Sequence, residues 1–317
     1  MNYNRIPDTI DLSGYLQEPD QAHKVDPARD WTQPAIDAFY KPDDAPKIYL
    51  PWAKTHADFD FRPGEVSLWG GINSHGKSQF VGQVVLGLMT QDEPVCIASL
   101  EMPPVTSLTR MLRQAWAGDM PSIDYIKRFF DWSNDRLWIY DHVGSSDPKT
   151  ILAVIRYAVD KFKVKHFVVD NLAKVIRGEQ GADVNNQQKD FVSGLCAVAH
   201  DTGVHVHLVL HVRKGEKESD VPGKFDIKGS GAITDLVDNV FIVWRNKAKE
   251  EKCRTGDMSE ADDPDALLKL EKQRNKGIEG SYHFWFDPAS CQYLPHRFDL
   301  PKQMRLETGI PLSEVEF

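Results

Sequence analysis

Between residues 64 and 211 the chain alternates short apolar runs with longer stretches in which apolar residues recur every three or four positions. The runs predict buried strands, and the periodic stretches predict helices with one buried face. This alternation is typical of an α/β domain whose mostly parallel sheet is covered by helices on both faces. Five strands are expected here, at 66–69, 94–100, 137–140, 166–170 and 206–210.

Helices are predicted to follow four of these strands. Pro148 marks the start of the third helix, because proline is tolerated at the first helical position, where its missing N–H is not needed. From there apolar side chains recur at helical spacing as far as Phe162. The expected helices are one that opens at 79–86, one at 106–116, one from Pro148, and one whose buried side carries Phe191, Leu195 and Val198.

The two ends of the chain depart from this pattern. Residues 1–50 are rich in proline and acids, which predicts an extended arm with at most a short helix near 32–39. Such an arm is either an inert tail or a segment that docks on a neighbouring subunit. Toward the carboxyl end, an acidic stretch at 250–265 is interpreted as a solvated loop. Late strands are expected on either side of it, at 240–244, 267–272 and 282–286.

The segment that joins the first strand to the first helix matches the pattern G-x-x-x-x-G-K-[ST] at 71–78. Strand, loop and helix in this order are the context that a phosphate-binding loop requires. Glycines let backbone N–H groups point inward around a polyphosphate, and the helix N-terminus adds partial positive charge. The alternative is a glycine-rich turn beside a core strand. The residues predicted to hold the nucleotide are Gly71, Asn73, Ser74, His75, Gly76, Lys77 and Ser78, with Lys77 on the β and γ phosphates and Ser78 on Mg²⁺.

Three polar residues end or follow other strands of the predicted sheet. Asp170 ends the fourth strand, Glu101 follows the second and His211 closes the fifth. Ligands of open α/β sheets gather at the carboxyl ends of the strands. Asp170 is therefore predicted on the Mg²⁺ side and Glu101 as the base, since Asn171 stands where many such ATPases carry a glutamate. His211 is predicted to sense the γ-phosphate. A strand-end cap, a solvated charge and a structural histidine are the respective alternatives.

Two long loops are expected after the fourth and fifth strands, at 173–189 and 213–228. Loops of this length inside a compact domain tend to be functional or disordered. Both mix basic and acidic residues, which fits either a solvated loop or contact with a nucleic-acid backbone. Their basic residues are Lys174, Arg177, Arg213, Lys214, Lys217, Lys224 and Lys228.

The overall charge limits the kind of nucleic-acid binding that is expected. The chain has 317 residues and a formal net charge of -9, which argues against a simple basic-surface binder but not against a ring with a positive channel. No apolar run approaches the ~20 residues of a membrane helix. The four cysteines form no C-x-x-C pair, so neither a zinc site nor a disulfide framework is suggested, and the cytoplasm is the expected compartment.

Taken together, these motifs resemble the ATPase domain of ring-forming replicative DNA helicases. That family includes the bacterial DnaB type, the mitochondrial Twinkle type and the helicase half of phage primase–helicases. The motifs keep the family's order over about 50–290. They are the phosphate loop, Ser-Leu-Glu-Met at 99–102, the strand ending in Asp170, the strand ending in His211, Lys-Gly-Ser-Gly at 228–231 with Asp238, and Lys-Gln-Arg-Asn at 272–275.

The resemblance implies a RecA-like core at 51–290 between the arm and a tail at 291–317, assembled as a homohexamer around single-stranded DNA. It also implies roles for Lys272 and Arg274, which match a basic pair that reaches the neighbouring subunit's nucleotide. The residues that it places at the DNA-contacting loops are Lys174, Arg177, Lys214, Lys217, Lys224, Lys228 and Gly229. A histidine at 211 is the sensor of the phage branch. No primase domain or DnaB-like helical domain is recognised before the core.

The function expected from this resemblance is an ATP-driven, 5′-to-3′ replicative helicase subunit that uses ATP or another nucleoside triphosphate with Mg²⁺. A separate primase and a loader are expected partners, in a bacterial or virus-infected cytoplasm. One alternative is a recombinase or annealing ATPase that forms open filaments. Another is a non-enzymatic, nucleotide-gated clamp or helicase-interaction protein, against which the set Glu101, Asp170 and Arg274 argues.

Overall fold

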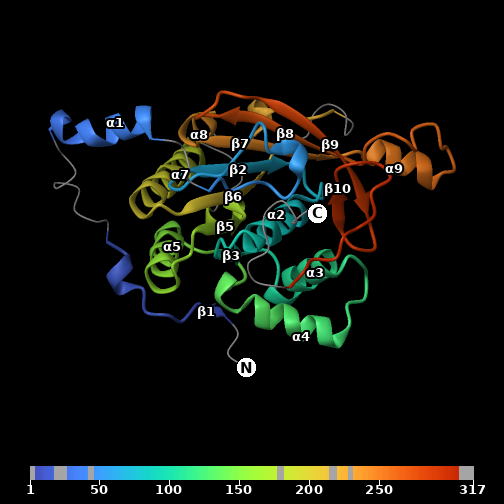
Figure 1. Ribbon diagram of the computed structural model, residues 1–317, viewed down its shortest axis with the longest axis horizontal. Coiled ribbons are helices and arrows are strands. Elements are labelled where there is room, and N and C mark those ends of the chain that lie inside the picture. The colour runs from blue at the N-terminus through green and yellow to red at the C-terminus, as the bar shows by residue number, and fades with distance from the viewer. Residues whose placement is uncertain are drawn as a thin grey trace.

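A single mixed sheet forms the centre of the molecule (Figure 1). The computed structural model describes residues 4–17, 27–41, 46–176, 182–213, 220–227 and 231–306. Within them the strand order is β1-β4-β3-β5-β6-β2-β7-β8-β9-β10. Seven strands run parallel: β1 (Arg5–Pro7), β2 (Val66–Gly71), β3 (Val95–Ser99), β4 (Leu137–Asp141), β5 (His166–Asp170), β6 (His205–His211) and β7 (Asn239–Arg245). Three antiparallel strands extend one side: β8 (Ala266–Gln273), β9 (Gly280–Asp287) and β10 (Gln292–Leu294).

Helices cover both faces of the sheet, and each face has its own apolar core. Successive residues of β2 point to opposite sides, so Leu68 belongs to one core and Trp69 to the other. The first face carries α5 (Pro148–Phe162), α6 (Leu172–Val175), α7 (Ala182–Thr202) and α8 (Ala232–Leu236). The second carries α2 (Lys77–Thr90), α3 (Pro104–Trp116) and α4 (Ile123–Trp132). Strands buried on both faces explain the uninterrupted apolar runs.

The register of the parallel strands brings their carboxyl ends to one edge. Gly71 pairs with His211 between β2 and β6, and Ser99 pairs with Asp170 between β3 and β5. Leu100 continues this alignment, because its backbone N–H donates to the Asp170 carbonyl over 2.7 Å. The phosphate loop and the strand-end residues predicted from the sequence therefore share this edge.

The expected α/β class, the parallel sheet and its late antiparallel strands are confirmed. Sequence signals also mark some helix starts correctly. Asp147 caps α5, and its carboxylate accepts from the backbone N–H groups of Lys149 and Thr150. The short helix expected near 32–39 is α1 (Thr32–Tyr40).

The arm contributes a strand that was not predicted, because β1 pairs with β4 through Arg5 and Ile139. Two expectations about the connecting segments are wrong. The acidic stretch at 250–265 begins within a helix, α9 (Lys247–Arg254), which Asn246 caps by accepting from the Lys249 N–H.

The predicted loop at 173–189 is largely helical as well. It contains α6 and the first turns of α7, which start at Ala182. These turns are polar apart from Val184, which packs on the core, so they show no apolar periodicity in the sequence. Across the described part of the chain, none of the helices combines the length and apolarity that crossing a bilayer requires.

Candidate nucleotide-binding site

The phosphate loop runs from Gly71, at the end of β2, into the first turn of α2. Ser74 and Gly76 both have positive φ, at 62° and 81°. A side chain at Gly71 would place its Cβ 2.5 Å from the Val243 carbonyl oxygen, and one at Gly76 would collide with the Tyr293 hydroxyl. The two glycines of the motif are thus required by the backbone and by its surroundings.

Lys77 extends from the start of α2 toward the loop and is buried. Its ammonium donates to the carbonyl oxygens of Gly71 and Ile72, over 2.9 and 3.0 Å. It also lies 3.1 Å from Nδ1 of His211. The ammonium therefore lies beside the loop, and its three N–H groups are directed at these three polar atoms. Oxygen atoms of a bound phosphate can replace them as acceptors.

Asp170 and Ser78 meet beside the loop. The Ser78 hydroxyl donates to the Asp170 carboxylate, which is buried. Burial raises the pKa of Asp170 and the charge of Glu101 adds to this, whereas the bond from Ser78 and the charge of Lys77 lower it. A buried carboxylate beside a hydroxyl is an oxygen-ligand set that suits Mg²⁺. Ser78 and Asp170 would hold the ion, and the predicted metal residues fit one another.

His211 connects Lys77 to the residues that follow β3 and β5. Its Nε2 lies 3.0 Å from the side-chain amide of Asn171 and 3.9 Å from Oε1 of Glu101. The structure thus brings Glu101, Asp170 and His211 to the edge where the phosphate loop lies, as expected from their places at strand ends. Their individual roles remain predictions.

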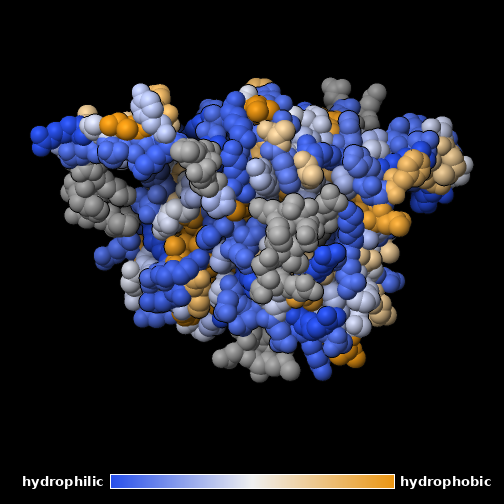
Figure 2. All heavy atoms as spheres, in the orientation of Figure 1, coloured by the Kyte–Doolittle hydropathy of each residue, from blue (hydrophilic) through white to orange (hydrophobic). Residues whose placement is uncertain are grey.

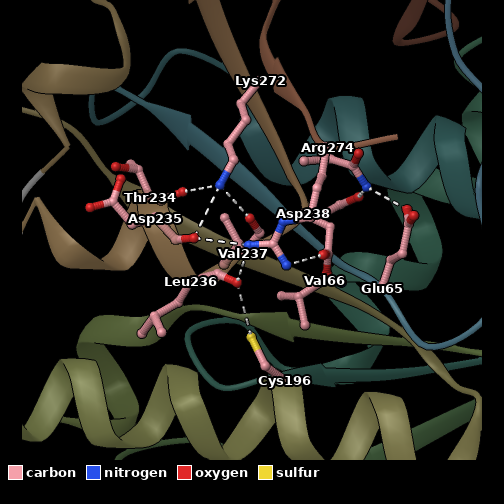
Figure 3. Close-up of polar contacts among 12 residues, drawn as sticks. Glu65, Val66, Cys196, Thr234, Asp235, Leu236, Val237, Asp238, Lys272 and Arg274 are labelled. Atoms are coloured by element: carbon pink, nitrogen blue, oxygen red, sulfur yellow. Dashed lines mark hydrogen bonds and ion pairs between the residues drawn. The ribbon is translucent and has the colours of Figure 1, made fainter. Parts of the chain in front are cut away.

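Lys272 and Arg274 lie at the opposite edge of the sheet, where Lys272 pairs with Val240 near the start of β7. Figure 3 shows their polar contacts. The Arg274 guanidinium pairs with Asp238 over 2.9 Å, and Asp238 in turn accepts from the N–H of Val66, at the amino end of β2. The Lys272 ammonium donates to the carbonyls of Thr234, Asp235 and Val237, and burial lowers its pKa. Since the phosphate loop leaves the carboxyl end of β2, neither residue reaches its own chain's loop.

Of the predicted DNA-contacting residues, the structure describes Lys174 and Lys224. Lys174 lies on α6, and its carbonyl accepts from the Ser146 N–H over 3.0 Å. The Lys224 ammonium donates to the Glu271 carbonyl and pairs with Glu279 over 3.0 Å. Outside the described residues lie Arg177, Lys214, Lys217, Lys228 and Gly229.

Several supports of the loop were not predicted from the sequence. The buried His75 accepts at Nδ1 from the Arg245 N–H over 3.1 Å, which ties the loop to the end of β7. Tyr293 of β10 contacts the loop, and its N–H donates to the Gln83 side chain over 2.8 Å. The only sequence signal for such a contact is the place of Gln83 among apolar residues of the predicted helix. The contact itself could not be predicted, because Tyr293 is far from Gln83 in the sequence.

Comparison with known proteins agrees with this geometry. The model of the DnaB-like helicase C terminal domain family matches residues 59–294, most of the chain. The chain belongs to this family. Its members are ATP-dependent DNA helicases that use a nucleotide and Mg²⁺. The DNA helicase/primase of Enterobacteria phage T3 is 24% identical over 255 residues, in a match that covers 72% of this chain and 43% of the phage protein.

Two solved structures show the same fold. One, described as an ATPase domain, superposes with a TM-score of 0.71 at 17% identity and covers 86% of this chain and 100% of its own. A DnaB-like replicative helicase, described together with its interactions with primase, gives 0.70 at 16% identity and covers 86% of this chain and 69% of its own. The predicted RecA-like ATPase fold and the resemblance to replicative helicases are confirmed. The chain spans less than half of the phage relative's length.

Proposed function

We propose that this chain is the ATPase subunit of a replicative DNA helicase that translocates 5′ to 3′ on single-stranded DNA as a ring. One observation carries the proposal. The phosphate loop, Asp170 and Glu101 lie at one edge of the sheet, whereas the basic pair of Lys272 and Arg274 lies at the other. A site that needs both sets is complete only between two copies of the chain.

In this proposal Lys77, Ser78 and Asp170 bind the phosphates of ATP and its Mg²⁺. The ion, when bound, neutralises charge on the phosphate oxygens. Glu101 accepts a proton from the attacking water, because its half-exposed carboxylate stands beside His211 at the mouth of the site. The His211 ring donates a hydrogen bond to the γ-phosphate. When hydrolysis removes this phosphate, the hydrogen bond at the end of β6 is lost.

Arg274 is proposed to complete the neighbour's site. Its side chain is 56% exposed, and the guanidinium must leave the partly buried Asp238 and the carbonyls of Asp235 and Leu236 to reach a neighbour's phosphate. An arginine supplied from a second subunit typically accelerates phosphoryl transfer by about 10³–10⁵. The antiparallel strand β8 fixes the position from which it acts.

The arm is proposed to dock on a neighbouring subunit. Helix α1 buries none of its residues, and Figure 1 shows it beside the sheet rather than on it. Ile36, Phe39 and Tyr40 share one face at helical spacing and are 45%, 84% and 84% exposed. Apolar residues are visible on this helix at the upper left of Figure 2. An apolar helical face of this kind suits a groove on another copy.

Single-stranded DNA is the proposed substrate of translocation, and Lys174 and Lys224 are proposed to lie near its backbone. A primase and a loader are the proposed partners, in the cytoplasm. Hexamer formation, the nucleotide preferred and these partners belong to the proposal. The charge of -9 argues against a simple basic-surface binder but is compatible with a ring whose inner surface is basic.

The test combines assembly and turnover. Native mass measurement with Mg²⁺ and a non-hydrolysable ATP analogue should give a six-fold assembly, and single-stranded DNA should stimulate ATP hydrolysis. Open filaments without strand separation, seen by electron microscopy, would favour the recombinase alternative. Nucleotide binding with negligible turnover, with or without DNA, would favour a nucleotide-gated clamp. A monomer that hydrolyses ATP at full rate would refute the ring.

A further inference from the structure

Both ring nitrogens of His211 have a polar neighbour, and the two neighbours come from different elements. Nδ1 lies 3.1 Å from Nζ of Lys77 at the start of α2. Nε2 lies 3.0 Å from the side-chain amide of Asn171, which follows β5, and 3.9 Å from Oε1 of Glu101. Which nitrogen carries the proton of the neutral ring is decided by these neighbours.

Lys77 determines the state of Nδ1. An ammonium has three N–H donors and no acceptor. Two of these donors go to the Gly71 and Ile72 carbonyls, over 2.9 and 3.0 Å, and His211 stands at the third. A proton on Nδ1 would face the ammonium directly. Nδ1 must therefore present its lone pair, and the ring proton resides on Nε2.

A proton on Nε2 needs an acceptor, and the Asn171 side-chain amide lies within hydrogen-bond distance of it. An amide has an acceptor at one end and a donor at the other, and the hydrogen-bond network determines which end faces a neighbour. If Nδ2 faced the ring proton, two donors would meet at 3.0 Å, and Oδ1 would be buried with no partner among the described residues. The carbonyl end therefore faces His211. Asn171 is 1% exposed, so its side chain is held in place by packing.

We propose that Asn171 is a positioning residue that holds His211 in the Nε2–H tautomer. Nε2 is the ring nitrogen that faces Glu101, on the side where the γ-phosphate is proposed to lie. In this tautomer Nε2–H can donate a hydrogen bond to a γ-phosphate oxygen. Nδ1 accepts from the Lys77 ammonium until the phosphates of a nucleotide bind that ammonium. In the opposite tautomer a bare lone pair would face the phosphate.

The first test is spectroscopic and needs no nucleotide. In the intact 317-residue chain labelled with ¹⁵N-histidine, the His211 signals are identified by comparison with His211→Gln. Nε2 should carry the proton and Nδ1 should not. In a Lys77→Ala background no ammonium faces Nδ1, so Asn171 alone should keep the proton on Nε2. Substitution there of Asn171 by leucine, which is similar in size but has no hydrogen-bonding group, should let the two tautomers mix. A wild-type ring protonated on Nδ1, or a tautomer that Asn171→Leu leaves unchanged in the Lys77→Ala background, would overturn the proposal.

The second test asks whether Asn171 acts through His211, and it rests on the proposed function. Asn171→Leu should reduce the preference for ATP over ADP by about 10- to 100-fold, the range seen when a metal-ligating histidine loses the partner that orients its ring. In a His211→Gln background the same substitution should add little. An equal loss in both backgrounds would refute positioning through His211. A protein that shows the expected tautomer but no ATP turnover would refute the helicase function alone.

Discussion

The hydroxyl of Tyr293 lies where a side chain at Gly76 would begin, so a Cβ at position 76 would collide with it. Tyr293 belongs to β10, the last strand of the antiparallel extension, and Gln83 of α2 bonds to its backbone in both directions. The carboxyl-terminal strands therefore do more than widen the sheet. They fix the flank of the loop that is proposed to bind the nucleotide.

Gly76→Ala should weaken nucleotide binding by at least about tenfold. Alanine is strained at a φ of 81°, by about 1–2 kcal/mol, and its methyl group meets the Tyr293 hydroxyl. Titration with a fluorescent nucleotide measures the effect. Adding Tyr293→Phe should restore part of the affinity, since the next atom of the ring is 3.5 Å away. Gly14→Ala, in open space, is the control. Full affinity in Gly76→Ala would contradict this account.

The sequence predicted which residues meet at the carboxyl ends of the parallel strands, because two simple rules apply there. Apolar runs mark the buried strands, and parallel strands align their carboxyl ends, so Asp170, Glu101 and His211 had to lie near the phosphate loop. Nothing in the periodicity relates Tyr293 to Gly76, since the contact depends on how the antiparallel strands fold back onto α2. Such long-range packing has no local signal.

Helix α4 and the strand β1 were missed for different reasons. Tyr125, Phe129 and Trp132 of α4 do recur at helical spacing, but the helix is short and follows α3 after a brief turn. β1 has three residues and is a strand only because β4 lies beside it. Lys272 and Arg274 were chosen through the family resemblance, since their chemistry depends on a second copy of the chain.

Glu101→Gln should lower kcat for ATP hydrolysis by about 10²–10⁴ with little change in nucleotide affinity. The amide keeps the shape of the side chain but cannot accept the proton of the attacking water. Steady-state hydrolysis and equilibrium binding, measured on one preparation, separate the two effects. Glu251→Gln, on the exposed surface of α9, should leave both unchanged. An unaltered kcat in Glu101→Gln would assign the base elsewhere.

Arg274→Ala should lower kcat by about 10³–10⁵ while the chain stays folded, because the half-exposed side chain makes polar contacts with Asp238, Asp235 and Leu236 but takes no part in the apolar core. Action between subunits gives a sharper expectation. Mixing Arg274→Ala with Lys77→Ala subunits should restore part of the hydrolysis that neither variant has alone. In mixed rings some sites combine Lys77 from one variant with Arg274 from the other. Mixed assemblies that stay inactive would refute a site shared between copies.

Three histidines stack in the core at a distance from the nucleotide edge. His166 Nδ1 lies 3.1 Å from His207 Nε2, while Phe61 packs its ring edge-on against both and against His205. Burial lowers the pKa of all three, to about 3 for His205 and well below the usual value for His207, although Glu93 opposes the shift at His166. The three imidazole rings are therefore neutral in the folded chain.

Acid should destabilise the fold through this cluster. Below about pH 6.5 the histidines of the unfolded chain are protonated, whereas those of the folded chain stay neutral. The unfolded state therefore binds more protons, and the stability that is present above pH 6.5 is lost as the pH falls toward 3. The free energy of unfolding should drop by up to about 1.4 kcal/mol per pH unit for each histidine. Urea unfolding between pH 8 and 5.5 measures this slope before most carboxylates titrate. His207→Gln should reduce the slope by about one proton, whereas His283→Gln, on an exposed position of β9, should not. Equal slopes in the wild type and His207→Gln would show that the cluster is not the source.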